Sequence, residues 1–373
     1  MSCDFFALAN TGVQGLHPYQ AGKPTDELER ELGLTDIVKL ASNENPLGVG
    51  ELVKAALEQE LAGINRYPDA NGFYLKQALA DKYDLVPEQF TLGNGSNDVL
   101  ELIARSFVTP EHEVIFAQHA FVVYPLVTQA IGATGVAVPA KDWGHDLAAM
   151  LAAITPRTRL IFIANPNNPT GTFLTAEALY EFLTQVPEEV IVVLDEAYFE
   201  YVDKELQAPS ITWLKEFSNL IITRTFSKAY GLAGLRIGYS MSHPDIADIL
   251  NRVRQPFNCN SLALAGATAA LSDHDFLTAS VALNNQQLDV LETFFDEQGI
   301  GYIPSKGNFI TMELAQDPAV VYQKLLHKGV IVRPVSGYGL AKHLRVSIGT
   351  ERENIVFMQA LISVLGEQMN VQS

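Results

Sequence analysis

The chain has 373 residues, of which 48% are hydrophobic and 18% are charged, enough to bury one large core or two moderate ones. Its formal net charge of -18 would repel nucleic acids and anionic membrane surfaces, and no apolar run approaches the length of a membrane span, so we expect neither partner. The two cysteines, Cys3 and Cys259, have no metal-ligand spacing and fit a reducing compartment, so we expect no disulfide framework and no metal site.

The N-terminal segment, residues 1–45, is too rich in loops to fold alone, and we expect it to be an arm that joins the C-terminal domain. Its opening residues contain an acidic residue, Asp4, with no basic cluster and no long apolar core. They therefore do not resemble a secretory signal, and we expect a cytoplasmic protein.

A glycine-rich stretch, Leu92-Gly93-Asn94-Gly95-Ser96-Asn97, precedes a segment with apolar residues at helical spacing. Backbone amides at a helix N-terminus bind anions, so this turn and the hydroxyl of Ser96 form a candidate phosphate site. The same residues, taken alone, also fit an ordinary tight turn.

Short β-branched runs alternate with longer helical patterns through the middle of the chain, which is typical of a mainly parallel sheet flanked by helices. Residues 176–186 carry apolar side chains at helical spacing and fit a crossover helix. We assign residues 46–280 to this large α/β domain. Its predicted strands include residues 114–116, 160–163, 190–194 and 220–223.

Polar side chains follow two of these predicted strands. Asp195 comes directly after an apolar run, at the carboxyl end of its strand, where ligands of open α/β sheets bind. Tyr198 follows shortly after, and Asn168 lies in the turn 165–171 after the preceding strand. A carboxylate, a phenol and an amide could hold the ring nitrogen and ring hydroxyl of a pyridoxal cofactor. Asp195 also fits a helix N-cap, and turn chemistry alone explains the prolines and glycine of residues 165–171.

Residues 225–236 set Lys228 among small hydroxyl residues and glycines, with Arg236 further along. A desolvated lysine near cations has a lowered pKa, and as a neutral amine it can form a Schiff base with pyridoxal phosphate and then move a substrate proton. Thr225, Ser227 and Arg236 could close the phosphate site opposite the glycine-rich turn. An isolated Ser-Lys pair is also typical of a surface loop.

The remaining residues, 281–373, predict a smaller α+β domain. A long helix predicted over 276–299 links it to the large domain, with Gly299 as its stop. The other expected elements are strands at 308–312, 330–333 and 343–348, a helix at 320–327 and a final helix from about residue 351.

Taken together and in this order, the motifs resemble those of fold-type I pyridoxal-phosphate aminotransferases, which have the aspartate-aminotransferase-like fold. The resemblance covers almost the whole chain. Within that superfamily the sequence is most similar to the histidinol-phosphate aminotransferases, because four segments outside the cofactor core resemble their signatures. These segments are residues 16–24, 40–46, 65–69 and 343–350.

The resemblance implies a bound pyridoxal phosphate, with Lys228 forming the Schiff base. It implies that Asp195 pairs with the pyridine nitrogen and that Asn168 and Tyr198 hold the ring hydroxyl. Phe121 occupies the position of the ring that stacks on the cofactor, where the family often has tyrosine, so stacking is kept and one hydrogen bond is lost. The implied phosphate ligands are Ser96, Asn97, Ser227, Arg236 and, from the neighbouring subunit, Tyr67.

The resemblance also implies a substrate pocket around Arg345, which matches the arginine that binds substrate carboxylates across aminotransferases. Histidinol phosphate carries a phosphate ester where that carboxylate would be, so one cationic pocket could serve this ester and glutamate. Tyr19 and Arg333 resemble its helpers, and Asn43 would also line the site. Without the resemblance, Arg345 fits a surface salt bridge on an edge strand.

The predicted reaction converts L-histidinol phosphate and 2-oxoglutarate into imidazole acetol phosphate and L-glutamate, a step of histidine biosynthesis. We expect a homodimer, because Tyr67 would complete the partner's site. Aromatic or broad-range amino-acid aminotransferases share the cofactor residues and stay open as an alternative, as does a threonine-phosphate decarboxylase. A non-catalytic pyridoxal-phosphate-binding regulatory module is a remote alternative, since every catalytic residue type is present and no DNA-binding extension exists.

Overall fold

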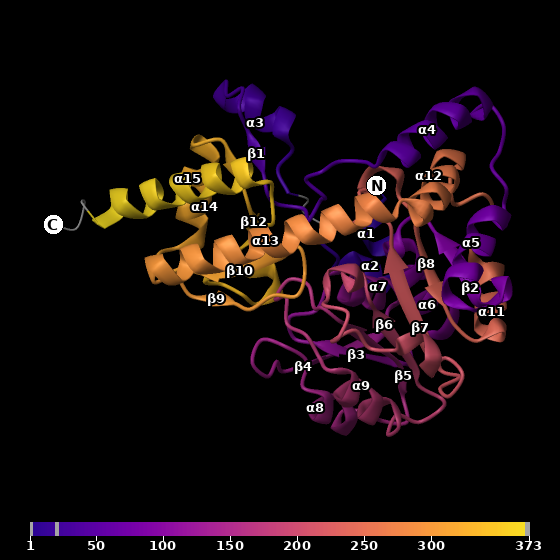
Figure 1. Cartoon of the computed structure of the whole chain (residues 1–373). Helices are drawn as coiled ribbons and strands as arrows, with labels where there is room; N and C mark the ends of the chain where they lie inside the picture. Colours follow the sequence, from indigo (N-terminus) through magenta and orange to yellow (C-terminus); the bar gives the residue numbers. More distant parts are fainter. Residues whose placement is uncertain (1–2, 19–21, 370–373) are drawn as a thin grey trace.

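The structure is a computed structural model that describes residues 3–18 and 22–369. Figure 1 shows a larger body that holds the long sheet, with the C-terminal elements gathered beside it and helix α13 (His274–Gln298) running between the two. Among the described residues, no helix is both long enough and apolar enough to cross a membrane.

The larger body is built around a seven-stranded sheet with the strand order β2-β8-β7-β6-β5-β3-β4. The five strands from β7 to β4 pair in parallel, whereas β8 runs antiparallel to both of its neighbours, β7 and β2. The predicted mainly parallel α/β fold is therefore confirmed. The strands are β2 (Phe90–Gly93), β3 (Glu113–Ala117), β4 (Thr134–Val138), β5 (Thr158–Ala164), β6 (Ile191–Asp195), β7 (Leu220–Thr225) and β8 (Gly238–Met241).

The central strands are buried on both faces, which explains why they read as unbroken apolar runs. Val192 and Leu194 pack into the core on one face, while Ile191 and Val193 pack into the core on the other. Because successive side chains of a strand point to opposite faces, each face needs its own layer of helices.

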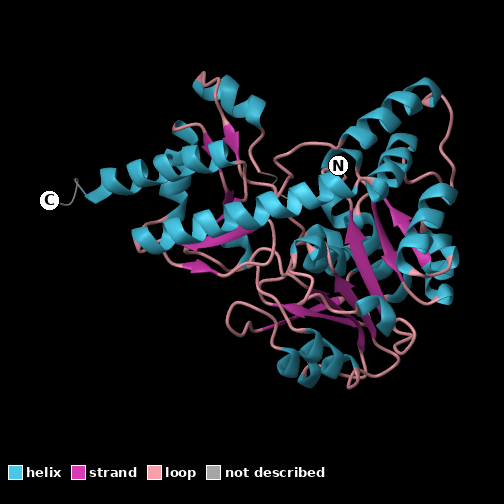
Figure 2. Cartoon of the chain, in the orientation of Figure 1, coloured by secondary structure: helices cyan, strands magenta, loops and turns pink. Residues whose placement is uncertain are grey.

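Two layers of helices supply these cores (Figure 2). The core around Val192 takes side chains from α4 (Glu51–Glu60), α5 (Phe73–Tyr83), α8 (Leu147–Ala152), α9 (Ala176–Leu183), α10 (Ser210–Trp213) and α12 (Ser261–Ser272). The opposite core takes side chains from α6 (Ser96–Phe107), α7 (Val123–Ile131) and α11 (Pro244–Val253). Short 3₁₀ helices are η1 (Leu61–Gly63), η2 (Pro87–Gln89), η3 (Phe199–Tyr201), η4 (Ala233–Leu235) and η5 (Ser336–Tyr338).

The C-terminal elements have a core of their own, formed between an antiparallel sheet and three helices. The strand order is β12-β13-β10-β9, and side chains such as Phe295, Leu325 and Phe357 fill the space beneath it. The strands are β9 (Tyr302–Ile303), β10 (Phe309–Glu313), β12 (Arg333–Pro334) and β13 (His343–Ser347), and the helices are α13, α14 (Pro318–His327) and α15 (Glu351–Met369).

The second half of the N-terminal arm is attached to this C-terminal unit, whereas α2 (Thr11–Gln14) at its start packs against α7 of the larger body. Strand β1 (Val38–Lys39) pairs in parallel with β11 (Val330–Ile331), and Leu28 of α3 (Thr25–Leu32) packs with Leu326 and Ile331. Ahead of them lie α1 (Phe5–Leu8) and α2.

One predicted strand differs from the structure, whereas the predicted linking helix is present. The strand predicted over 330–333 is split, because β11 pairs with β1 while β12 pairs with β13 in a different sheet. Helix α13 begins at His274, where the side chain of Asp273 caps it, so one continuous helix spans the division we predict between residues 280 and 281.

Candidate active site

The carboxyl ends of β5, β6 and β7 meet at one edge of the large sheet, and a cavity of about 320 Å³ opens there. Asp195 is the last residue of β6, and Lys228 lies three residues beyond the end of β7. The structure brings nearly all of the predicted site residues to this cavity. They are Asn43, Ser96, Asn97, Phe121, Asn168, Asp195, Tyr198, Thr225, Ser227, Lys228, Arg236, Arg333 and Arg345.

Two predicted residues are not brought to the cavity. Tyr67 lies apart from it, 82% exposed, with its ring stacked on Phe257 at a centroid distance of 4.7 Å. Within one chain it does not line the cavity. Tyr19 lies outside the described residues.

Asp195 is held by a residue that the sequence analysis missed. The Tyr124 hydroxyl, on α7, donates a 2.7 Å hydrogen bond to Oδ2 of Asp195. Oδ1 is buried and has no hydrogen-bond partner among the described residues. Burial raises the pKa of the Asp195 carboxyl, and the hydrogen bond from Tyr124 opposes that rise. A cationic N–H donor would satisfy the open oxygen.

Tyr198 is fixed by two amides. Asn43 and Asn168 donate from Nδ2 to its hydroxyl at 2.9 and 3.2 Å. Burial raises the pKa of Tyr198 to about 12, so its phenol keeps its proton at neutral pH. Asn43 is itself anchored by Ser347 of β13, whose Oγ accepts from the Asn43 backbone at 2.8 Å. Through Asn43, both the N-terminal arm and the C-terminal sheet are therefore connected to Tyr198.

The glycine-rich turn and Arg236 form an anion cradle. Gly95 has a φ of 87°, and a Cβ added there would lie 2.5 Å from Nη2 of Arg236, so only glycine lets the guanidinium approach. Ser96 begins α6, whose first backbone amides have no partner within the helix. The amides, the Ser96 hydroxyl and the guanidinium together suit a phosphate.

Arg345 is not the surface salt bridge on an edge strand that the sequence alone also allows. Strand β13 lies between β12 and β10, and Arg345 is only 5% exposed. Its guanidinium donates to Oδ1 of Asn168 and, at 2.9 Å, to the carbonyl of Ala41. Arg333 stands opposite Arg345 across the two strands. Two buried arginines that line one cavity from adjacent strands suit an anionic substrate group.

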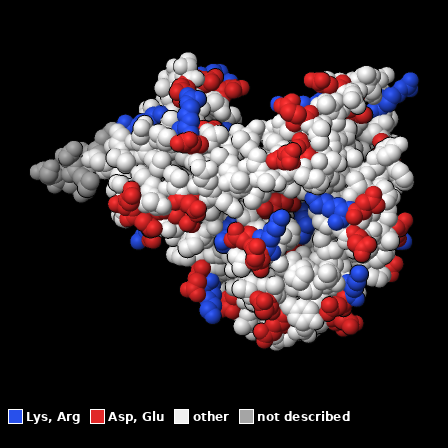
Figure 3. Space-filling view, viewed as in Figure 1, with Lys and Arg blue, Asp and Glu red and all other residues white. Residues whose placement is uncertain are grey.

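Positive charge is concentrated in this cavity of a strongly acidic protein. On the face drawn in Figure 3, acidic and basic side chains are scattered in small groups instead. Burial lowers the pKa of Lys228 to about 8, and the charges of Arg345 and Arg236 act in the same direction. Nζ of Lys228 donates to the Ser42 carbonyl at 3.2 Å. The charged lining side chains are Glu44, Asp195, Lys228, Arg236, Arg333 and Arg345.

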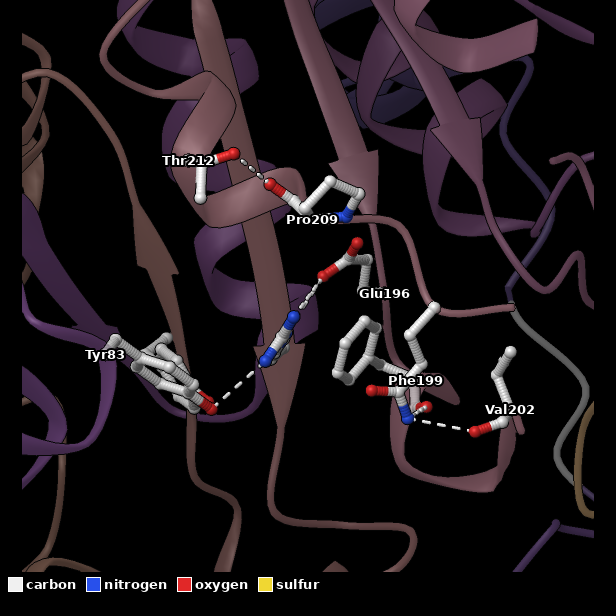
Figure 4. Close-up of polar contacts among 9 residues, drawn as sticks. Tyr83, Glu196, Phe199, Val202, Pro209 and Thr212 are labelled. Carbon is white, nitrogen blue, oxygen red and sulfur yellow. Dashed lines mark hydrogen bonds and ion pairs between the residues drawn. The ribbon is translucent and has the colours of Figure 1, made fainter. Parts of the chain in front are cut away.

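A second group of buried charges includes Glu196 (Figure 4), the residue that follows Asp195 in the chain. Arg224 donates from Nε and Nη2 to Oε2 of Glu196 at 2.9 and 2.7 Å, and both side chains are 3% exposed. Its third bond reaches the Tyr83 hydroxyl at 3.2 Å, and its Cζ lies 3.6 Å from the ring centroid of Phe199. The pair ties the residue after Asp195 to the strand that leads to Lys228.

These side chains fit pyridoxal phosphate, the cofactor expected from the sequence. The open oxygen of Asp195 suits a protonated ring nitrogen, and the amides on Tyr198 suit a ring hydroxyl beside them. The cradle around Gly95 and Arg236 suits the phosphate. The lowered pKa of Lys228 suits an amine that must be neutral to react with an aldehyde.

Comparison with known proteins identifies the class. The model of the aminotransferase class I and II family matches residues 35–361, and the chain belongs to this family. The protein is therefore an aminotransferase by family.

Two curated relatives narrow the comparison further. The chain is 61% identical over 359 residues to histidinol-phosphate aminotransferase 1 of Idiomarina loihiensis, covering 96% of this chain and 98% of that protein. It is 60% identical over 363 residues to histidinol-phosphate aminotransferase 2 of Pasteurella multocida, covering 97% and 99%.

Among solved structures, histidinol-phosphate aminotransferase from Sinorhizobium meliloti in complex with pyridoxal-5'-phosphate matches with a TM-score of 0.88 and 29% identity, over 96% of this chain and 97% of that one. An aspartate aminotransferase double mutant from Thermus thermophilus matches with a TM-score of 0.82 and 24% identity, over 95% and 99%, which shows the shared fold.

Proposed function

We propose that this protein is a pyridoxal-phosphate-dependent aminotransferase that converts L-histidinol phosphate and 2-oxoglutarate into imidazole acetol phosphate and L-glutamate in histidine biosynthesis. The names of the relatives that are 61% and 60% identical support this reaction. The observation that carries it is a single cavity lined by Arg236 and Arg345, each close enough to Lys228 to lower its pKa. Arg236, beside the glycine-rich turn, suits the cofactor's phosphate, and Arg345 suits the substrate's phosphate.

When bound, pyridoxal phosphate supplies an aldehyde that condenses with amines and a protonated ring that withdraws electrons from the substrate's α-carbon. Lys228, neutral in part at physiological pH, would hold the cofactor and then carry the proton between the substrate's α-carbon and the imine carbon. Asp195 would keep the ring nitrogen protonated, and the hydrogen bond from Tyr124, which opposes the effect of burial on the pKa of Asp195, favours its ionised form. Tyr198 and Asn168 hold the ring hydroxyl.

The remaining contacts are assigned from the resemblance to the family, and the residues concerned line the cavity. Phe121 would stack on the cofactor ring. On the substrate side, Arg345 and Arg333 bind the phosphate of histidinol phosphate or the carboxylate of glutamate, with Asn43 and Tyr19 as further contacts. The proposed phosphate ligands of the cofactor are Ser96, Asn97, Thr225, Ser227 and Arg236.

The proposal includes a cytoplasmic homodimer. Tyr67 is 82% exposed among other exposed apolar side chains, including Leu61, Ile64 and Tyr74, an arrangement that suits burial against a second copy. From there Tyr67 would reach the cofactor phosphate of the partner. We also keep the division into an arm of residues 1–45, a large domain of 46–280 and a small domain of 281–373, which the separate C-terminal core supports.

A coupled assay of purified protein tests the reaction. Imidazole acetol phosphate and glutamate are mixed with the enzyme, and 2-oxoglutarate formation is followed. We expect turnover by the natural chain and none by Lys228→Ala. Turnover that survives in Lys228→Ala, or its absence in the natural chain, would reject the proposal.

A further inference from the structure

Trp143 lies at the tip of a two-residue turn whose backbone disfavours it. Asp142 and Trp143 have φ values of 49° and 64°, and Lys141 and Gly144 exchange backbone hydrogen bonds of 3.2 and 2.8 Å. Turns with two left-handed residues favour Asn-Gly or Asp-Gly, because a Cβ in this region crowds the backbone. A tryptophan held there is a strained residue, and strain of this kind collects where a side chain has a task.

The Trp143 ring bridges two parts of the molecule. It packs edge-on against His343 at a centroid distance of 5.0 Å and lies 5.8 Å from the ring of His119. His343 belongs to strand β13 of the C-terminal sheet, whereas His119 follows β3 of the large sheet. Trp143, which belongs to the larger body, therefore contacts a histidine of each part.

The backbone of His343 pairs with Glu313 of β10, whereas its ring is held by packing. It is 4% exposed, and neither of its ring nitrogens has a hydrogen-bond partner among the described residues. Burial lowers the pKa of His343, so the imidazole packs against the indole as a neutral ring.

Both contacts lead to residues that line the cavity. His343 and Arg345 are two residues apart on β13, so their side chains leave the same face of the strand. The ring of His119 makes a 2.7 Å hydrogen bond with the carbonyl of Tyr338, and Tyr338 lines the cavity beside Arg345.

We propose that Trp143 is a positioning residue, which holds β13 and the Tyr338 segment against the large sheet so that Arg345 meets the anionic group of the substrate. This proposal rests on the proposed function, because it assigns that group to Arg345. Trp143 does not line the cavity and acts through His343 and His119.

The test replaces the turn residues by the pair that the turn prefers. In the double variant Asp142→Asn/Trp143→Gly, the backbone strain of the turn is relieved, and the contacts of the Trp143 ring are lost. We expect the KM for histidinol phosphate to rise about tenfold, with kcat changed less than about twofold, because binding of the anion is loosened while the chemistry is kept. Amide hydrogen exchange over residues 336–347 of the holoenzyme should become faster. Asp142→Asn and Trp143→Phe are the matched controls, and both should stay close to the natural chain in KM and exchange.

The proposal is overturned if the double variant keeps the natural KM, whether or not exchange changes, because the contact would then be packing alone. It is also overturned if the KM rises without faster exchange over residues 336–347. The same holds if Trp143→Phe raises the KM and speeds exchange as much as the double variant does. Hydrogen exchange requires no turnover. A natural chain inactive on histidinol phosphate would therefore reject the proposed function, while exchange alone would still decide whether Trp143 holds β13.

Discussion

Tyr124 donates its hydroxyl proton to Oδ2 of Asp195 across 2.7 Å, while Oδ1 of the same carboxylate is buried without a hydrogen-bond partner among the described residues. The bond comes from a ring already fixed by stacking on Phe162 at 4.5 Å, with the two planes 4° apart. The orientation of Asp195 is therefore set by a side chain of α7, a helix on one face of the sheet.

The variant Tyr124→Phe keeps the stacked ring and removes the hydrogen bond. Because that bond lowers the pKa of Asp195 against the effect of burial, its loss favours the neutral carboxyl and weakens the contact with a protonated ring nitrogen. We expect the dissociation constant of pyridoxal phosphate, measured by equilibrium dialysis, to rise about tenfold. Tyr180→Phe, which removes a surface hydroxyl bonded to Glu216, is the control. Natural affinity in Tyr124→Phe would contradict this role.

Lys228 makes the stability of the cofactor-free protein depend on pH. Its pKa is about 8 in the folded chain against an ordinary value of 10.5, so between these two values the unfolded chain binds more protons. The cost of burying the charged amine is therefore fully present below pH 8 and disappears as the pH rises toward 10.5. Lys228→Met removes this cost, and its free energy of unfolding at pH 7 should exceed that of the natural chain by on the order of 1–3 kcal/mol.

Denaturant unfolding at a series of pH values measures this difference. The two proteins should converge as the pH approaches 10.5. A constant difference across the whole range would show that the methionine acts by packing and not by removing a buried charge.

In the buried ion pair between Arg224 and Glu196, each side chain compensates the charge of the other. Arg224→Met alone leaves Glu196 buried without its partner, which costs about 3–5 kcal/mol in the free energy of unfolding. Adding Glu196→Met removes both charges, and we expect the double variant to recover most of that loss. The measurement is urea unfolding of the holoenzyme for both single variants and the double variant. If the double variant loses the sum of the two single losses, the pair is not coupled.

Mixed dimers test whether Tyr67 serves the partner's site. Lys228→Ala and Tyr67→Ala should each have low activity as pure dimers, since each site would lack one of its two contributions. In a mixed dimer one site receives an intact Lys228 from one chain and an intact Tyr67 from the other. Unfolding and refolding the two variants together should restore about a quarter of the natural activity. An unchanged low activity after mixing would place both residues in the site of a single chain.

Much of the site could be predicted from sequence because its residues follow strands in chain order. Asp195, Lys228 and Asn168 each lie just beyond an apolar run, and parallel strands bring their carboxyl ends to one edge. Tyr124 could not be found in this way, because it lies inside a helix among apolar residues and its hydroxyl has no local signal. Its position three residues after Phe121, at the start of a helix beside the cavity, is the nearest clue.

The C-terminal unit was harder to predict in detail. The run at 330–333 reads as one strand, but its backbone changes partner at Val332, from β1 to β13. That change depends on the pairing with the N-terminal arm, which lies about 290 residues earlier in the chain. The local pattern of apolar residues does not predict such a distant partner. The burial of Arg345 is equally hard to predict from sequence. It depends on the two strands that flank β13 and on the Ala41 carbonyl, which lies 304 residues earlier in the chain.

The most direct test of the proposed function is a comparison of amino donors. Enzyme loaded with pyridoxal phosphate is mixed with histidinol phosphate, phenylalanine or glutamate, and loss of the cofactor's visible absorption gives kcat/KM for each half-reaction. We expect histidinol phosphate to exceed phenylalanine by at least about a hundredfold, and Arg345→Ala to lose most of that preference because the phosphate then lacks its arginine. A natural chain that prefers phenylalanine would contradict the account and identify an aromatic aminotransferase.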